Sequence, residues 1–216
     1  MLWFVGRITE FNEGGVHGFL HFPAEPSGEG MVLTHGAGSN CAAPLLLEMA
    51  QAACATGITV LRCDLPFRQR RAYGPPMPAG SAADRAGLHN AAATIRSLVR
   101  GPVILGGHSY GGRQSSMLAA EEPGVAAALL LISYPLHPPA KPLELRTGHF
   151  PALRTPALFV QGSRDKFATH AELTEALAAI PGPSRIMPVE GAPHEIGRGL
   201  IDYAAAFAQL RQWIAS

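Results

Sequence analysis

The 216-residue chain carries 17 basic and 16 acidic side chains, a formal net charge of +1. This balance leaves no global field to recruit nucleic acid or an anionic membrane surface. Hydrophobic residues make up 47% of the chain and charged residues 15%, which excludes a disordered or acidic activation segment. A chain of this length buries about 70% of its unfolded surface. We therefore predict a single domain over residues 1–216 that needs no disulfide or metal for stability.

No segment indicates export or membrane insertion. Residues 1–10 lack the basic and apolar regions of a signal peptide, and the longest apolar run, residues 125–132, is too short to cross a bilayer. The three cysteines, Cys41, Cys54 and Cys63, have no metal-ligand spacing. We expect a soluble, cytoplasmic protein whose thiols stay reduced, with no metal and no organic cofactor.

Short apolar runs alternate with helix-length segments from residue 30 onward. Two strands, 2–11 and 16–22, precede them and are joined by a turn at residues 12–15, Asn12-Glu13-Gly14-Gly15. The later expected strands are 31–34, 58–63, 103–105, 127–133, 157–161 and 185–189. The expected helices are 44–55, 82–99, 112–122, 169–180 and 199–215. Continuous apolar strands alternating with helices predict an α/β fold, a mostly parallel sheet with helices on both faces.

Two long segments interrupt this alternation. Residues 64–80 and 134–155 are rich in proline, glycine and basic side chains, and each follows the C-terminal end of an expected strand. Open α/β sheets bind ligands at that edge, and long connections without regular structure are usually functional. We therefore expect a pocket built from these loops, with no inserted helical lid domain.

The strongest motif is the G-x-S-x-G segment at residues 107–111, which lies between an expected strand and an expected helix. This is the context of a nucleophile elbow, in which a strained turn exposes a serine above the sheet. Its glycines are needed where the helix packs close to the strand. We predict that Ser109 is the nucleophile, against the alternative of a glycine-rich turn without chemistry.

A serine needs a base, and in this fold the acid and then the base follow the nucleophile along the chain. Asp165 and His194 each follow an expected strand in that order, so we predict a Ser109-His194-Asp165 triad. The alternatives are a helix N-cap for Asp165 and a solvent-facing imidazole for His194. The other candidate acids are Glu190, Glu195 and Asp64.

An oxyanion intermediate also needs backbone N–H donors. One should be the N–H of Tyr110, which follows the nucleophile, and the other should come from the loop at residues 35–40. We predict Ala37 as this second donor, with Gly38 as the other candidate. A phosphate-binding loop is the competing interpretation, but the segment lacks the Walker lysine and the G-x-G-x-x-G spacing.

Six segments carry a resemblance to a known family: HGAGSN, DLPFRQRR, GGHSYGGRQ, YPLHPP, FVQGSRDKF and PHEI. They resemble the small lidless bacterial hydrolases of the α/β-hydrolase superfamily, in the branch related to dienelactone hydrolase, over residues 30–214. The resemblance implies a sheet of about eight strands, with the nucleophile after the fifth, the acid after the seventh and the base after the eighth. Dienelactone hydrolases use cysteine where this chain has Ser109, so their substrate is not implied.

Several other side chains could line the pocket. We take Arg68, Arg70, His137 and Arg146 as candidate substrate-binding residues, since arginine matches carboxylate or phosphate oxygens. We expect Arg113 to pair with Asp64 across adjacent strand ends. For Cys41, which follows the oxyanion loop, we expect a half-buried, inert thiol rather than a reactive one.

These residues predict a serine hydrolase that cleaves a carboxylic ester or thioester through an acyl-enzyme. A serine amidase or peptidase would use the same triad, and a non-catalytic binding or scaffold protein could use the same fold. The expected partner is a small-molecule acyl substrate, with a negative group near the scissile bond as a further hypothesis. No nucleic-acid partner is expected.

Overall fold

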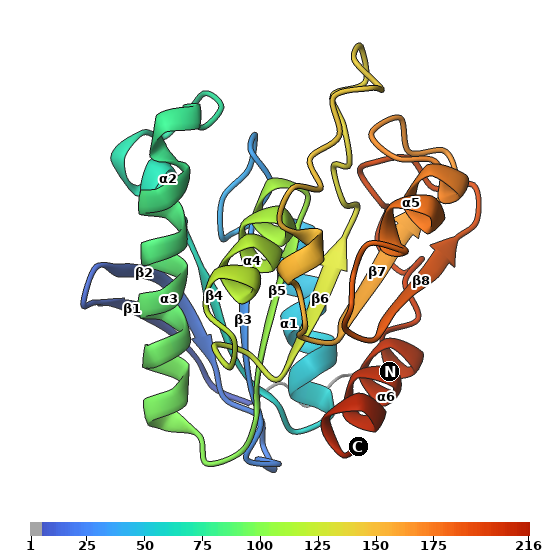
Figure 1. Ribbon diagram of the computed structural model, residues 1–216. Coiled ribbons are helices and arrows are strands. Elements are labelled where there is room, and N and C mark those ends of the chain that lie inside the picture. Colours follow the sequence, from blue (N-terminus) through green and yellow to red (C-terminus); the bar gives the residue numbers. More distant parts are fainter. Residues whose placement is uncertain (1–5) are drawn as a thin grey trace.

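The computed structural model describes residues 6–216 (Figure 1). Residues 2–5 of the first expected strand lie outside this range. Eight strands form one sheet in the order β1-β2-β4-β3-β5-β6-β7-β8. Their bounds are β1 Ile8–Glu13, β2 Val16–His21, β3 Gly30–Thr34, β4 Thr59–Cys63, β5 Val103–His108, β6 Ala128–Ile132, β7 Ala157–Gly162 and β8 Ser184–Val189. Only β2 runs antiparallel to its neighbours, so the predicted mostly parallel sheet is confirmed.

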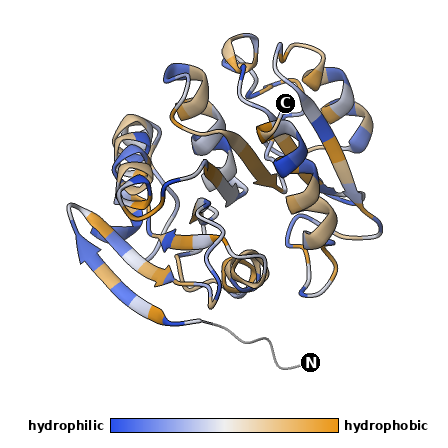
Figure 2. Cartoon of the chain, turned by 90° about the horizontal axis from the view of Figure 1, so that it is seen from below, coloured by the Kyte–Doolittle hydropathy of each residue, from blue (hydrophilic) through white to orange (hydrophobic). Residues whose placement is uncertain are grey.

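The β1–β2 hairpin forms the antiparallel edge of the sheet. Glu13 pairs with Val16, which leaves Gly14 and Gly15 as a two-residue turn with φ values of 61° and 76°. A tight hairpin turn requires positive φ at both positions, which glycine adopts without strain. Figure 2 shows hydrophilic and hydrophobic residues mixed along the two strands, as expected for an edge hairpin with one solvated face.

Helices cover both faces of the sheet (Figure 1). Helices α1 (Pro44–Ala55) and α6 (Tyr203–Ile214) pack on one face. Helices α3 (Ser81–Leu98), α4 (Tyr110–Glu121) and α5 (His170–Leu177) pack on the other. Adjacent residues of β5 serve the two cores: Ile104 packs with α1 and α6, and Leu105 packs on the opposite face. Both side chains are fully buried, which explains the continuous apolar runs of the central strands.

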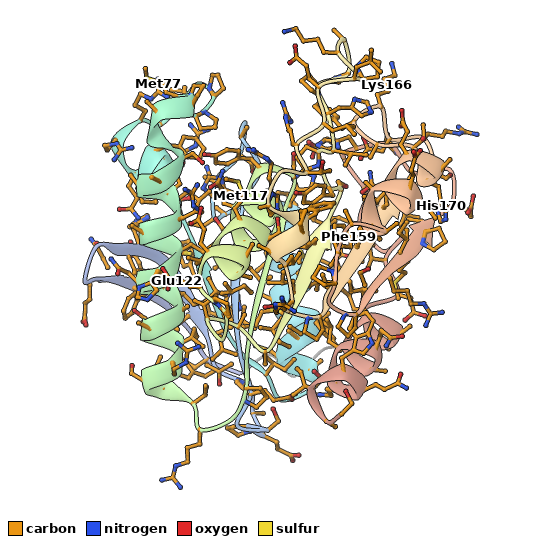
Figure 3. The ribbon with its side chains drawn as sticks, in the orientation of Figure 1. Met77, Met117, Glu122, Phe159, Lys166 and His170 are labelled. Atoms are coloured by element: carbon orange, nitrogen blue, oxygen red, sulfur yellow. The ribbon has the colours of Figure 1, made fainter. Side chains whose placement is uncertain are left out.

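The two long segments lie at the C-terminal edge of the sheet and contain short elements that the sequence analysis did not predict. These are α2 (Pro66–Arg70) and the 3₁₀ turns Pro78–Gly80 and Phe150–Ala152. Met77 and Lys166 stand on the two sides of this upper edge (Figure 3). Within residues 6–216 no helical domain is inserted between strands, as predicted. None of the described helices is long and apolar enough to span a bilayer.

Close packing of β5 and α4 positions the turn between them. A Cβ atom on Gly107 would lie 2.7 Å from the carbonyl oxygen of Thr34, and one on Gly111 would lie 2.7 Å from the carbonyl oxygens of Thr34 and His35. These contacts with backbone atoms explain why the turn needs glycine on both sides of Ser109.

We therefore expect Gly111→Ala to lower the free energy of unfolding by about 1–3 kcal/mol, because an added methyl group would push α4 away from β3. Gly148→Ala is the control: a Cβ there meets no atom within 4 Å, and the change should stay within about 0.5 kcal/mol. Urea denaturation followed by circular dichroism measures both. Equal stability of the two variants would contradict the close approach.

Candidate active site

Ser109 lies in a strained turn between β5 and α4. It has φ 50° and ψ −114°, one of two non-glycine residues with positive φ in residues 6–216. Its N–H donates to the carbonyl oxygen of Ile132 at 2.8 Å, and its own carbonyl oxygen accepts from the N–H of Arg113 at 3.0 Å. The turn is therefore fixed between β6 and the first turn of α4. Such backbone strain is characteristic of nucleophile elbows.

A chain of hydrogen bonds joins Ser109, His194 and Asp165. The Oγ of Ser109 lies 2.9 Å from the Nε2 of His194, and the Nδ1 of His194 lies 2.7 Å from the Oδ2 of Asp165. Asp165 follows β7 and His194 follows β8, so three separate strand ends bring these side chains together. Glu190 and Glu195, the other nearby candidate acids, form no hydrogen bond with His194 in residues 6–216.

The surrounding hydrogen bonds define the tautomer of His194. The backbone N–H of Tyr134 can only donate, so it fixes the Gln161 amide with Oε1 facing it at 2.8 Å. The Gln161 NH₂ group must then donate to Oδ2 of Asp165, at 2.7 Å, while the N–H of Phe167 donates to Oδ1 at 2.8 Å. Asp165 accepts on both oxygens, so His194 Nδ1 must carry a proton. In the neutral ring, Nε2 is left to accept the Ser109 hydroxyl proton.

Aromatic packing holds the imidazole of His194 in place. The Phe167 ring lies over it with a centroid distance of 4.1 Å and an interplanar angle of 33°. His108, inside the elbow, lies 5.4 Å from it by centroid, and its Nε2 is 3.3 Å from the carbonyl oxygen of His194. Burial lowers the pKa of His108, so this imidazole is neutral and packs against the triad. The sequence analysis missed Gln161 and Phe167; their only signal is their position beside Asp165.

Two backbone N–H groups are placed to bind an oxyanion. Ala37 and Tyr110 line the same cavity as Ser109, and in residues 6–216 neither N–H donates a hydrogen bond to another group. Tyr110 is the first residue of α4, where helix geometry leaves the N–H without an acceptor. A Cβ on Gly36 would lie 2.9 Å from His108 Nδ1, so this loop runs directly against the elbow. Gly38, the second candidate, lines the cavity beside Ala37.

A buried carboxylate fixes the start of the nucleophile helix. The Tyr110 hydroxyl donates to Oδ2 of Asp84 at 2.7 Å, and the N–H of Phe67 donates to Oδ1 of the same side chain at 2.9 Å. Asp84 is fully buried. It therefore links α2, α3 and the residue that supplies one of the oxyanion donors.

Arg68 has a structural position, which corrects its assignment as a substrate-binding residue. Its guanidinium is 6% exposed and donates to five backbone carbonyl oxygens, at 2.7 to 3.2 Å. The acceptors are Ala37, Ser39, Arg71, Ala72 and Gly74. Arg68 thus ties the oxyanion loop to the segment after β4, and its donors are all used.

Of the other candidate substrate-binding residues, the structure places one at the cavity and two outside it. Arg70 is exposed on α2 and does not line the cavity. His137 is buried against Glu172, with its Nε2 3.4 Å from the carboxylate, and is also outside the cavity. Arg146 lines the cavity, as expected.

The expected pairing of Arg113 with Asp64 is wrong. Asp64 instead accepts from the N–H of Cys41 at 2.7 Å and lies 3.2 Å from Nδ1 of His17. Arg113 lies one helical turn after Ser109, and its side chain lines the cavity instead of reaching the end of β4. Ser109 precedes the helix in a non-helical turn, and its side chain and that of Arg113 line the same cavity.

The cavity above Ser109 has a volume of about 900 Å³, within the range of small-molecule sites. The loop after β3 and the segment after β4 line part of it. Its other lining residues include Ser109, Tyr110, Arg113, Arg146, Phe167 and His194.

The potential metal ligands near the site are engaged by protein groups. Two sets of three donors lie close together in residues 6–216: His17, Cys41 and Asp64, and His108, His194 and Glu195. In the second set, both ring nitrogens of His194 are hydrogen-bonded within the triad. In the first, burial and nearby Asp64 raise the pKa of the Cys41 thiol to about 12, so it stays protonated and poorly nucleophilic.

Comparison with known proteins agrees with the fold described above. The sequence matches the family described as alpha/beta hydrolase domain over residues 27–199. Similar solved structures include Est1E from Butyrivibrio proteoclasticus (14% identity, TM-score 0.73, covering 97% of this chain and 99% of that one). A dienelactone hydrolase from Anabaena variabilis is 21% identical, with a TM-score of 0.69 and coverage of 97% and 96%. XC6422 from Xanthomonas campestris, a serine hydrolase without lid, is 17% identical, with a TM-score of 0.70 and coverage of 99% and 97%. Within residues 6–216 the chain has no helical lid, like XC6422. It belongs to the alpha/beta hydrolase domain family.

Proposed function

We propose that this protein is a serine hydrolase that cleaves a carboxylic ester or thioester of a small molecule through an acyl-enzyme. The observation that carries the proposal is the continuous hydrogen-bonded chain from Ser109 through His194 to Asp165, at 2.9 and 2.7 Å. It opens on a cavity lined by Ala37 and Tyr110, whose backbone N–H groups have no acceptor in residues 6–216. Nucleophile, base, orienting acid and oxyanion donors are the parts that acyl transfer requires.

In the acylation step, Ser109 Oγ attacks the carbonyl carbon of the substrate. The hydroxyl proton passes to His194 Nε2, and Asp165 stabilises the imidazolium that forms. The N–H groups of Ala37 and Tyr110 donate to the developing oxyanion. The tetrahedral intermediate then collapses, and the proton on Nε2 leaves with the alcohol or thiol.

In the deacylation step, His194 takes a proton from water, and the resulting hydroxide attacks the acyl carbon. Collapse of the second intermediate returns the proton to Ser109 Oγ and releases the carboxylic acid. No step requires a redox change or a group that the chain does not provide. We place the reaction in the cytoplasm, in keeping with the free thiols.

Covalent labelling tests the nucleophile. A fluorophosphonate should add once to the wild-type protein at Ser109, because the base and the oxyanion donors activate this hydroxyl alone. Intact-mass spectrometry should show the adduct in the wild type and none in Ser109→Ala. Ser133→Ala is the matched control, since Ser133 is the other serine with positive φ and is fully buried. Equal labelling of Ser109→Ala would reject the assignment.

The pH profile tests the base. His194 must be neutral to accept the Ser109 proton, so kcat/KM should rise as the pH is raised from acidic values. Two other histidines near the site do not interfere: burial lowers the pKa of His108, and burial with Arg113 and Arg85 lowers that of His149 to about 4.

The corresponding variant, His194→Ala, should lose about three decades or more of kcat. His108→Gln serves as the comparison, because His108 packs on the triad without bonding to Ser109. A His194→Ala protein that kept most of its activity would identify another base.

A pair of matched substitutions tests the acid. Asp165→Asn should reduce kcat by about 10⁴, by analogy with the loss measured in another serine triad. The reason is that its amide NH₂ would face one of the three donors that the carboxylate now accepts from. Asp64→Asn should reduce kcat less than about tenfold, since the carboxylate of Asp64 contacts Cys41, His17 and His35, none of which belongs to the triad. Steady-state kinetics on a 4-nitrophenyl ester measures both; the reverse ranking would move the acid to Asp64.

A further inference from the structure

Two arginines share the active-site cavity without a carboxylate partner. Arg113 and Arg146 both line the cavity above Ser109, and within residues 6–216 neither forms an ion pair. The Nε of Arg113 is buried and has no hydrogen-bond partner among residues 6–216. In the same range, the side chain of Arg146 makes one long contact, 3.4 Å from its Nη1 to the carbonyl oxygen of Pro135. A buried guanidinium N–H without a partner is costly, so a missing ligand group is a natural explanation.

The positive charges of Arg113 and Arg146 are not neutralised by the acidic side chains described around them. Burial and the charge of Arg113 lower the pKa of Arg146, which indicates that the two guanidinium groups repel each other. Among nearby acids, Glu144 pairs with Lys141 at 2.8 Å, and Asp84 accepts from Tyr110 and Phe67. Glu195 also lines the cavity, but its side chain is 83% exposed, and it lies 3.9 Å from Nε2 of the neutral His108. Arg85, by contrast, has its own partner in Glu121 at 2.7 Å.

The position of Arg113 is also unfavourable for the stability of helix α4. It lies in the first turn of α4, where the helix dipole already has its positive end. A cation there destabilises the helix, so stability of the fold does not account for it. Arg113 and Ser109 line the same cavity. An anion bound to Arg113 there would therefore lie close to the reacting carbonyl.

We propose that Arg113 and Arg146 form a carboxylate-binding subsite, so that the natural substrate is an ester or thioester that also carries a carboxylate near its scissile bond. This inference rests on the proposed hydrolase function of Ser109. The planar N–H fork of arginine matches the two oxygens of a carboxylate. The substrate carboxylate would accept from the guanidinium groups that line the cavity and would relieve the repulsion between them.

Paired substrates test the subsite. In the first series the carboxylate is on the acyl part: mono-4-nitrophenyl succinate, glutarate and adipate, each compared with its methyl-capped, neutral diester. In the second it is on the leaving group: 3-carboxyphenyl acetate against its methyl ester. Uncatalysed release is subtracted, and each pair is measured at low and moderate salt. We expect wild-type kcat/KM to favour the anionic member of a pair in at least one series.

Variants then assign the preference to the two arginines. Arg113→Gln and Arg146→Gln should each reduce kcat/KM for the preferred anionic ester roughly 10- to 100-fold, with kcat/KM for its neutral partner nearly unchanged. Lys141→Gln removes the same charge from the exposed part of the same loop and should keep the preference. The melting temperature of Arg113→Gln should stay equal to that of the wild type or rise, because a repulsion is removed, whereas a structural role would make it fall.

Binding provides a readout that does not depend on turnover. Titration calorimetry of Ser109→Ala with monomethyl adipate should show binding that Arg113→Gln abolishes. Binding without turnover or fluorophosphonate labelling in the wild type would reject the hydrolase function and keep the subsite. Labelling and turnover with no anionic preference in either series would reject the subsite and keep the hydrolase, as would a preference unchanged in both arginine variants.

Discussion

The strained backbone of Ser109 is the constraint on which the rest of the site depends. A non-glycine residue at φ 50° is destabilised by roughly 1–3 kcal/mol and persists only where its surroundings hold it. Three sets of contacts hold the turn in this conformation. The N–H of Ser109 donates to Ile132, and its carbonyl oxygen accepts from Arg113. Gly107 and Gly111 lie in close contact with the chain at the end of β3. The same turn ends β5 and begins α4, so it projects Oγ from the sheet edge and leaves the Tyr110 N–H without an acceptor.

Buried polar side chains hold the loops in place, as apolar packing holds the sheet together. Asp84 joins two helices to Tyr110, Gln161 joins β7 to Asp165, and Arg68 joins the oxyanion loop to the segment after β4. Such groups stabilise only when every donor and acceptor is satisfied, because an unpaired one in a low-dielectric interior is heavily penalised. Arg68 meets this condition with five carbonyl acceptors. Arg113, with its unpartnered Nε, does not, and this contrast separates a structural arginine from one left open to a ligand.

The sequence was sufficient for the features that depend on local pattern. Continuous apolar runs identified the central strands, and the glycines around Ser109 identified the turn because no larger residue fits against β3. The helix at Pro44–Ala55 was predicted with its observed bounds, since Pro44 fits a first turn. The sequence pattern did not predict in which direction each side chain points. Arg68 and Arg70 are two residues apart on one short helix, yet one is buried and the other exposed. A five-residue helix has too few turns to show a period, and the tertiary contacts that orient Arg68 come from a loop about 30 residues away.

The position of the two cavity arginines has a consequence for the chemistry. If the substrate carries a carboxylate near the scissile carbonyl, the oxyanion that forms during attack would be repelled by it. In the proposed subsite the guanidinium groups neutralise that charge before the reaction begins, so the Ala37 and Tyr110 donors act on one negative charge instead of two. The positive end of α4 acts in the same direction on both groups. Loss of Arg113 would then affect kcat as well as KM for an anionic ester. The repulsion between the carboxylate and the oxyanion grows as the transition state is approached. Only interactions that strengthen in the transition state accelerate the chemical step. For a neutral ester this repulsion does not exist, and the same arginine would contribute little to either constant.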